Sequence, residues 1–195
     1  MRRWIEPVTL EGRHVRLEPL TLDHVPGIAA AAADGELWKL WYTAVPAPGE
    51  ERAYVETALE QRDRQGWCPF VVRDAAGEIV GSTRYMNVDE KHHRLEIGTT
   101  FYAQRVQRTP LNIEAKLLLL GHAFDRLGAI AVEFRTHFMN HASRTAIARL
   151  GANQDCILRN HQIGREGELR DTVVFSILPT EWPAVRANLT LKLAR

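Results

Sequence analysis

Alternating apolar and polar positions predict most of the β-structure of this chain. In such a run, successive side chains point to opposite faces of a sheet. The clearest run is residues 94–102, where Leu95 and Ile97 share one face and Glu96 lies on the other. We expect strands at residues 14–20, 69–73, 79–86, 94–102, 130–137, 154–163 and 170–178, with a turn at residues 164–167 before the last strand.

Apolar residues at helical spacing predict the helices. The strongest pattern covers residues 111–127, where Leu117, Leu120 and Phe124 recur on one face. We expect further helices after Thr21 through the alanines at 29–33, at residues 49–65, at residues 140–150 with Gly151 as the C-terminal cap, and after a cap at Thr180.

The order of these elements predicts the fold class. Strand hairpins before and after a central strand–helix–strand crossover give an α/β fold with a mixed, predominantly antiparallel central sheet and flanking helices. A length of 195 residues suits a single domain, 1–195. A ligand of such a sheet is expected near the carboxyl ends of its central strands.

The composition of the chain excludes some classes of function. Hydrophobic residues make up 45% and charged residues 25%, with a net charge of +1, so no strong attraction to nucleic acid or membranes is expected. The chain has two cysteines, and no apolar segment follows its basic start, so we expect a cytoplasmic protein. The histidines lack metal-ligand spacing with cysteine or carboxylate partners, so no metal site is predicted.

The segment before the strongest helix has the features of an anion site. Thr109 suits the N-cap and Pro110 the first helical position, which leaves the N–H groups of Leu111 and Asn112 free to bind an anion. Arg105 and Arg108 precede them, and a diphosphate would suit this combination. A capped helix with solvated arginines is the other interpretation of the same residues.

Two further sequence features supply polar side chains to the candidate site. Glu96 is a carboxylate in the middle of the strand that leads to this site, so it needs a partner or a function. Asn140 opens the helix after the next strand, where it can cap the helix, and Ser143 lies one turn further on.

The chain resembles the RimJ/RimL-like branch of the GNAT superfamily of N-acetyltransferases over nearly its whole length. The diagnostic parts are residues 95–98 (LEIG), residues 107–112 followed by Glu114 and Ala115, and residues 140–143 (NHAS) followed by 149–152 (RLGA). The resemblance implies a GNAT fold, acetyl-CoA as donor and a possible homodimer. In the family's phosphate loop, Pro110 and Asn112 stand where small residues are usual, which removes one amide donor and adds bulk.

The resemblance also implies roles for individual residues. Glu96 is the candidate base, acting directly or through water, and Ser143 the candidate donor of a proton to the leaving thiolate. A structural ion pair with Arg94 or another arginine is the alternative for Glu96, and a helix-start hydrogen bond is the alternative for Ser143. Residues expected to bind acetyl-CoA are Thr100, Phe101, Arg105, Gln107, Arg108, Thr109, Leu111, Asn112 and Asn140.

The acceptor side is expected near Trp38, Trp41 and Tyr42, with core packing as the alternative for at least one of them. The acceptor expected from the resemblance is the terminal α-amine of a protein or peptide. A small-molecule amine (an amino acid, polyamine or aminoglycoside) is the alternative, and a polycationic one would require several carboxylates in the cleft. A non-catalytic module that binds acyl-CoA is the third possibility.

Overall fold

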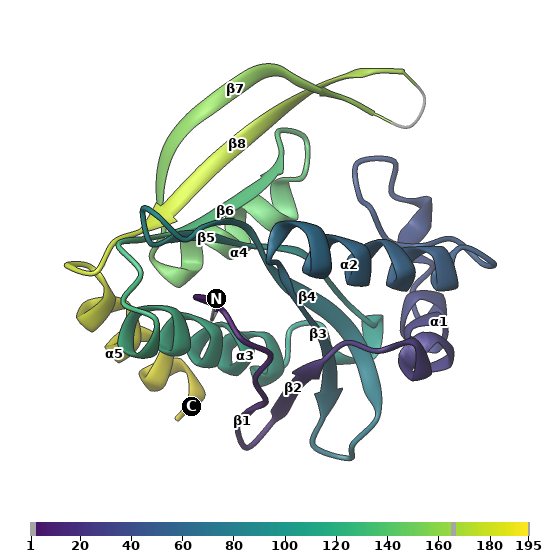
Figure 1. Ribbon diagram of the computed structural model, residues 1–195, viewed down its shortest axis with the longest axis horizontal. Helices are drawn as coiled ribbons and strands as arrows, with labels where there is room; N and C mark the ends of the chain where they lie inside the picture. Colours follow the sequence, from purple (N-terminus) through teal and green to yellow (C-terminus); the bar gives the residue numbers. More distant parts are fainter. Residues whose placement is uncertain (1–2, 165–166, 195) are drawn as a thin grey trace.

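A single sheet runs through the molecule. The computed structural model describes residues 3–164 and 167–194. In that part of the chain, eight strands pair in the order β1-β2-β3-β4-β5-β6-β8-β7 (Figure 1). Every neighbouring pair is antiparallel except β5 and β6, which confirms the predicted mixed, mainly antiparallel sheet. The strands are β1 (Leu10–Glu11), β2 (Val15–Pro19), β3 (Cys68–Asp74), β4 (Ile79–Asp89), β5 (Arg94–Tyr102), β6 (Ala131–His137), β7 (Asn153–Ile163) and β8 (Leu169–Ile177).

Helices cover both faces of the sheet. Tyr85 and Arg84 are neighbours on β4, so their side chains point to opposite faces. The Tyr85 hydroxyl bonds to the backbone of Leu119 on α3, whereas Arg84 bonds to Gln61 on α2. Helices α3 and α5 lie side by side on the first face, and β7 and β8 project from the sheet as a long curved hairpin (Figure 1). The helices are α1 (Val25–Ala33), α2 (Glu51–Gln65), α3 (Pro110–Gly121), α4 (His141–Leu150) and α5 (Trp182–Leu193), with short 3₁₀ turns at η1 (Leu22–His24), η2 (Leu37–Lys39) and η3 (Gln104–Val106).

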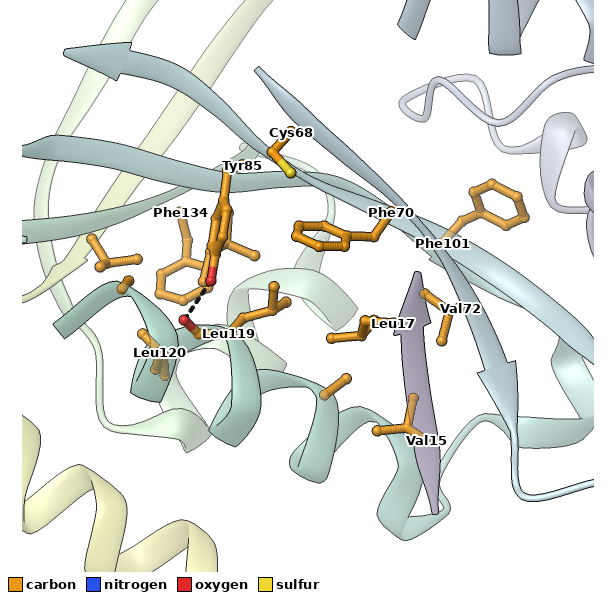
Figure 2. Close-up of a cluster of buried hydrophobic side chains, with 14 of the residues drawn as sticks. Val15, Leu17, Cys68, Phe70, Val72, Tyr85, Phe101, Leu119, Leu120 and Phe134 are labelled. Carbon is orange, nitrogen blue, oxygen red and sulfur yellow. Dashed lines mark hydrogen bonds between the residues drawn. The ribbon is translucent and has the colours of Figure 1, made fainter. Parts of the chain in front are cut away.

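The main core lies between the sheet and α3. Figure 2 shows the Tyr85 side chain directed toward α3, where its hydroxyl donates to the carbonyl of Leu119 at 2.7 Å. The ring of Phe70 meets the Tyr85 ring edge-on at 5.4 Å, and both residues are completely buried. Because the buried hydroxyl has an acceptor, this large side chain can fill the core without an unsatisfied polar group. These contacts fix the position of α3 beneath the centre of the sheet.

A buried carboxylate fixes the other end of α3. Glu114 accepts hydrogen bonds from the backbone N–H groups of Arg13 (2.9 Å) and His14 (2.5 Å), in the turn between β1 and β2. A Cβ atom at Gly12 would lie 2.4 Å from the Glu114 carboxyl carbon, so a larger residue there would displace the hydrogen-bonded carboxylate. Glu114, which belongs to one of the motifs that carry the resemblance, therefore serves the fold.

Three sequence-based expectations need correction. The helix predicted over residues 111–127 is regular only as α3, and a π-helical turn η4 (His122–Arg126) completes it. In that turn Asp125 accepts a hydrogen bond from the indole of Trp182 at 3.1 Å, so tertiary packing accompanies the change. Thr180 is not the cap of the last helix, because Glu181 holds that position. The two-residue strand β1 was not expected.

The turn expected at residues 164–167 lies partly outside the described residues. Among the described helices, none combines the length and the hydropathy needed to cross a membrane.

Candidate active site

The sheet opens where β5 and β6 diverge. These parallel strands pair over residues 94–96 and 131–133, ending at Glu96 opposite Glu133. Beyond this pair lies a cavity of about 490 Å³, here called the inner cavity, lined by β5, β6, α4, the start of α3 and the β7–β8 hairpin. His137 also lines a neighbouring outer cavity of about 730 Å³. The opening lies at the carboxyl ends of the two central strands, as the sequence predicted.

A β-bulge shapes one wall of the inner cavity. Gly98 pairs with Arg84 and Phe101 with Ser82, so two residues of β5, Thr99 and Thr100, face a single residue of β4. Thr99 has a φ of 46°, which breaks the regular alternation of β5. A bulge removes backbone groups from the ladder of hydrogen bonds, and both threonines and Phe101 line the cavity. Backbone N–H groups at this bulge are thus candidates to stabilise an oxyanion.

Glu96 is a buried carboxylate beside this bulge. It is 4% exposed, accepts a hydrogen bond from Asn87 Nδ2 at 2.7 Å and lies 3.4 Å from the Nε of Arg135. Burial raises the pKa of Glu96, although the Asn87 hydrogen bond and the charges of Arg135 and Arg170 partly oppose this effect. Its arginine partner is Arg135, whereas Arg94 pairs with Glu133. The group can therefore both form an ion pair and accept a proton.

The start of α3 confirms the predicted cap but changes the predicted anion site. Thr109 Oγ1 accepts a hydrogen bond from the N–H of Leu111 at 3.4 Å, so the prediction of a free N–H at buried Leu111 is wrong. Asn112 lines the inner cavity, and its Oδ1 is buried with no hydrogen-bond partner among the described residues. Gln107 also lines the cavity and donates to the carbonyl of Tyr102 at 3.0 Å, which ties the loop to the end of β5.

The two arginines of this loop differ. Arg105 lies 3.5 Å from Asp34 and 3.6 Å from Asp74, so its charge is already balanced. Arg108 is exposed just before the helix, with a φ of 63°, and forms no ion pair within the described part of the chain. Arg108 is therefore the arginine left available for a phosphate.

The start of α4 forms another wall of the inner cavity. Asn140 Oδ1 accepts a hydrogen bond from the N–H of Ser143 at 3.0 Å, which confirms Asn140 as the cap. Both side chains line the cavity. The role of the Ser143 hydroxyl stays a prediction.

The three aromatic residues expected on the acceptor side line the two cavities, and their role toward the acceptor stays a prediction. Trp38 and Trp41 line the outer cavity, and Tyr42 lines the inner cavity. Trp41 packs edge-on against Tyr42 at 5.5 Å and against His137 at 4.8 Å. Because Trp41 is 50% exposed, core packing does not explain its position.

Five cavity residues were not recognised in the sequence as site residues. Lys116 is 6% exposed on α3; its Nζ lies 3.3 Å from Thr100 Oγ1, and burial lowers its pKa to about 7. A lysine within the apolar stripe of a buried helix was a signal that could have identified it. The others carried no local signal, because strands far apart in the sequence bring them together. They are Asn87, Arg135, His137 and Arg170.

Few acidic side chains face the inner cavity. Among its described lining residues, Glu96 is the only carboxylate, while Lys116, Arg135 and Arg170 are basic. The cavity therefore lacks the cluster of carboxylates that a polycationic ligand would require.

Comparisons with known proteins agree with this geometry. A family model described as "Acetyltransferase (GNAT) domain" matches residues 14–153, well over half of the chain. A proposed acetyltransferase from T. thermophilus is 36% identical, with a TM-score of 0.86, and the match covers 97% of this chain and 99% of that one. A GCN5-related N-acetyltransferase from Brucella melitensis is 32% identical, with a TM-score of 0.84, over 98% of this chain and 88% of that one.

More distant structures share the fold. Mycobacterium smegmatis RimJ, solved with CoA-disulfide, is 19% identical with a TM-score of 0.79, and the match covers 95% of each chain. Among proteins with curated descriptions, none matches this sequence. The residues matched by the family model, 14–153, include β5, β6 and the loop before α3. The chain therefore belongs to the GNAT acetyltransferase family, and it is an acetyl-CoA-dependent N-acetyltransferase.

Proposed function

We propose that this enzyme acetylates the α-amine at the amino terminus of a protein or peptide, as a RimJ/RimL-like enzyme whose one catalytic domain spans residues 1–195. The observation that carries the proposal is that Glu96, at the point where β5 and β6 diverge, is the only carboxylate among the described residues lining the inner cavity. One weakly basic carboxylate suits an acceptor that loses its proton easily.

The basicity of the acceptor decides how much help it needs. A terminal α-amine has a pKa of about 7.7–8.0 and a lysine side chain about 10.4. Near neutral pH an α-amine is partly neutral already, whereas a lysine would remain almost fully protonated. Burial raises the pKa of Glu96, which makes this carboxylate a stronger base toward an α-amine.

The inner cavity and the start of α3 fit acetyl-CoA. Arg108 and the backbone amides at the start of α3 would hold the pyrophosphate, and Gln107 lies at the adjoining end of β5. The unpartnered Oδ1 of Asn112 offers an acceptor to a donor on the cofactor. Asn140 faces the same cavity from α4. Acetyl-CoA supplies an acetyl group activated as a thioester.

The chain's own groups would then perform the transfer. Glu96 accepts the proton of the amine, directly or through water, and the Thr100 and Phe101 amides at the bulge stabilise the negative charge on the carbonyl oxygen. Ser143 donates a proton to the departing thiolate. Trp38, Trp41 and Tyr42 border the path by which the acceptor arrives.

A small-molecule amine is the second candidate. The microcin C7 self-immunity acetyltransferase MccE, solved with acetyl-CoA and AMP, shares the fold at 13% identity and a TM-score of 0.74. Glu96 is the only carboxylate among the described residues that line the inner cavity, which disfavours polyamines and aminoglycosides there but leaves an amino acid possible; Glu168 and Asp171 line the outer cavity. A proposed ribosomal-protein-serine acetyltransferase from Vibrio cholerae, 19% identical with a TM-score of 0.76, by contrast motivates the protein acceptor.

The test is release of free CoA thiol across a panel of amines. Short peptides with free amino termini should be turned over faster than the same peptides with blocked amino termini and a free lysine, and faster than spermidine or kanamycin. Preference for a polyamine would contradict the proposal. Calorimetric binding of acetyl-CoA without thiol release from any amine would instead favour a non-catalytic module.

A further inference from the structure

Two buried hydrogen-bond donors of the inner cavity have no acceptor in the part of the chain that the structure describes. The N–H of Met139 donates to Nδ1 of His137 at 3.0 Å, so a neutral His137 ring carries its hydrogen on Nε2. That Nε2 is buried and has no partner among the described residues. The Nε of Arg170 is also buried without a partner in this part of the chain. An unmatched buried donor is costly, so both groups call for an acceptor.

The two donors lie on the same wall. His137 pairs with Thr172 across β6 and β8, and Arg170 is two residues from Thr172, so all three side chains point to one face of the sheet. Both donors line the inner cavity. They are close enough to interact, since burial and then the charge of Arg170 lower the pKa of His137, while the charges of Glu168 and Asp171 act in the opposite direction.

Neighbouring polar groups do not provide the missing acceptor. Thr172 Oγ1 lies 3.1 Å from Nδ1 of His161, and Asp171, on the opposite face of β8, pairs with Arg159 at 2.5 Å. Arg135 is held by Glu133 at 2.8 Å. Arg170 has no ion pair within 4 Å among the described residues, although Glu96 attracts it at longer range.

We propose that Arg170 and His137 form an anion subsite that binds a carboxylate carried by the amine acceptor. This inference rests on the proposed function and specifies its substrate. The guanidinium supplies the positive charge and several N–H donors, and the imidazole N–H supplies one further hydrogen-bond donor. The amine then lies toward Glu96, on the same face of the sheet. The carboxylate can be the α-carboxylate of a free amino acid or an acidic side chain near a peptide's amino terminus.

Matched amines test the subsite. The first pair is L-serine and L-serinamide, and the second is the C-terminally amidated tripeptides Ser-Glu-Ala and Ser-Gln-Ala. Initial rates of thiol release give kcat and KM for each. Arg170→Gln removes the charge and Arg170→Lys keeps it, while Arg52→Gln makes the same charge change at an exposed residue of α2. Thermal unfolding checks that each variant folds.

We expect the wild type to prefer the carboxylate-bearing member of at least one pair, and the preferred pair identifies the source of the carboxylate. Arg170→Gln should raise KM for that member by about 10–100-fold, the range of a lost hydrogen bond to a charged group. In Arg170→Gln, KM for the neutral member and for acetyl-CoA should stay within about twofold of the wild-type values. In Arg52→Gln, KM for every substrate should stay within the same range. Arg170→Lys should restore part of the preference.

Equal use of both members by the wild type, or an equal loss for both in Arg170→Gln, would overturn the subsite while leaving the acetyltransferase proposal intact. If no amine releases thiol, the proposed function fails. Calorimetry of the same four amines with the enzyme–CoA complex then tests independently whether the subsite binds a carboxylate. Carboxylate-dependent binding that Arg170→Gln abolishes would support it, and binding indifferent to the carboxylate would overturn it.

Discussion

Arg135 lies 3.4 Å from Glu96, and Glu96 belongs to the last residue pair before β5 and β6 separate. Its guanidinium also contacts Glu133 at 2.8 Å, so Glu96 holds only a share of its charge. Asn87 supplies the second contact of Glu96, at 2.7 Å. The carboxylate is thereby held at the mouth of the opening while burial favours its protonated form.

Replacing Glu96 by glutamine keeps the shape of the side chain and removes its basicity. We expect kcat for a peptide amine to fall by about 100-fold or more, the usual contribution of a positioned general base, with KM for acetyl-CoA nearly unchanged. Thiol release under saturating substrates measures it. Glu133→Gln, a neighbouring carboxylate that does not line the inner cavity, is the matched control and should have a much smaller effect. Full turnover by Glu96→Gln would remove the base assignment.

The environment of Glu96 predicts the pH dependence of the reaction. A base works only when deprotonated, so kcat/KM should fall as pH drops through the pKa of Glu96. Asn87 lowers that pKa by its hydrogen bond. Asn87→Gly removes the bond and suits the backbone there, which has a φ of 47°. We expect the acid limb of the variant to move to higher pH with the same peptide substrate. A limb that stays in place or moves to lower pH would contradict this role of Asn87.

Lys116 predicts a stability change with a defined pH window. Burial lowers its pKa from 10.5 to about 7, so between these values the unfolded chain binds a proton that the folded chain does not. This destabilisation is complete below pH 7 and disappears as pH rises above 10.5. Lys116→Met should therefore raise the free energy of unfolding by about 2–4 kcal/mol near pH 7. Denaturant unfolding at pH 7 and pH 10 should show the gain shrinking, and a gain independent of pH would refute the explanation.

The loop before α3 predicts unequal roles for its arginines. Arg105 is paired with Asp34 and Asp74, whereas Arg108 is exposed beside the helix start. Arg108→Gln should weaken CoA binding by about 10-fold, in the range of one lost charge-assisted hydrogen bond, and the weakening should diminish at high salt. Arg105→Gln should change Kd by less than about threefold. Calorimetry with CoA measures both, and a larger effect at Arg105 would reverse the assignment.

The sequence was sufficient for those parts of the fold that follow from local patterns. Alternation predicted β5 to its end residues, 94–102, and the Asn140 cap follows from its side chain and position. The sequence could not predict the bulge at Thr99, because nothing within the strand itself indicates a shift in register that arises from its pairing with β4. The π-helical turn η4 was also missed, since its apolar spacing continues that of α3.

The sequence identified only those residues of the candidate site that stand out within their own helix or strand. Glu96 and Asn140 were found this way, and both line the inner cavity. Arg170 and His137 were not, because they become neighbours only when β8 pairs with β6. Leu111 was assigned a free N–H that Thr109 in fact occupies, since a side chain able to cap a helix also competes for the amides an anion would use.

On this mechanism, the opening between β5 and β6 directs an α-amine, through Glu96, to the acetyl group of acetyl-CoA. The most direct measurement uses one peptide with a free amino terminus and one internal lysine, incubated with enzyme and acetyl-CoA and then mapped by tandem mass spectrometry. We expect a single acetyl group on the amino terminus with the wild type and its near absence with Glu96→Gln. Acetylation of the lysine instead, or equal labelling by both enzymes, would contradict it.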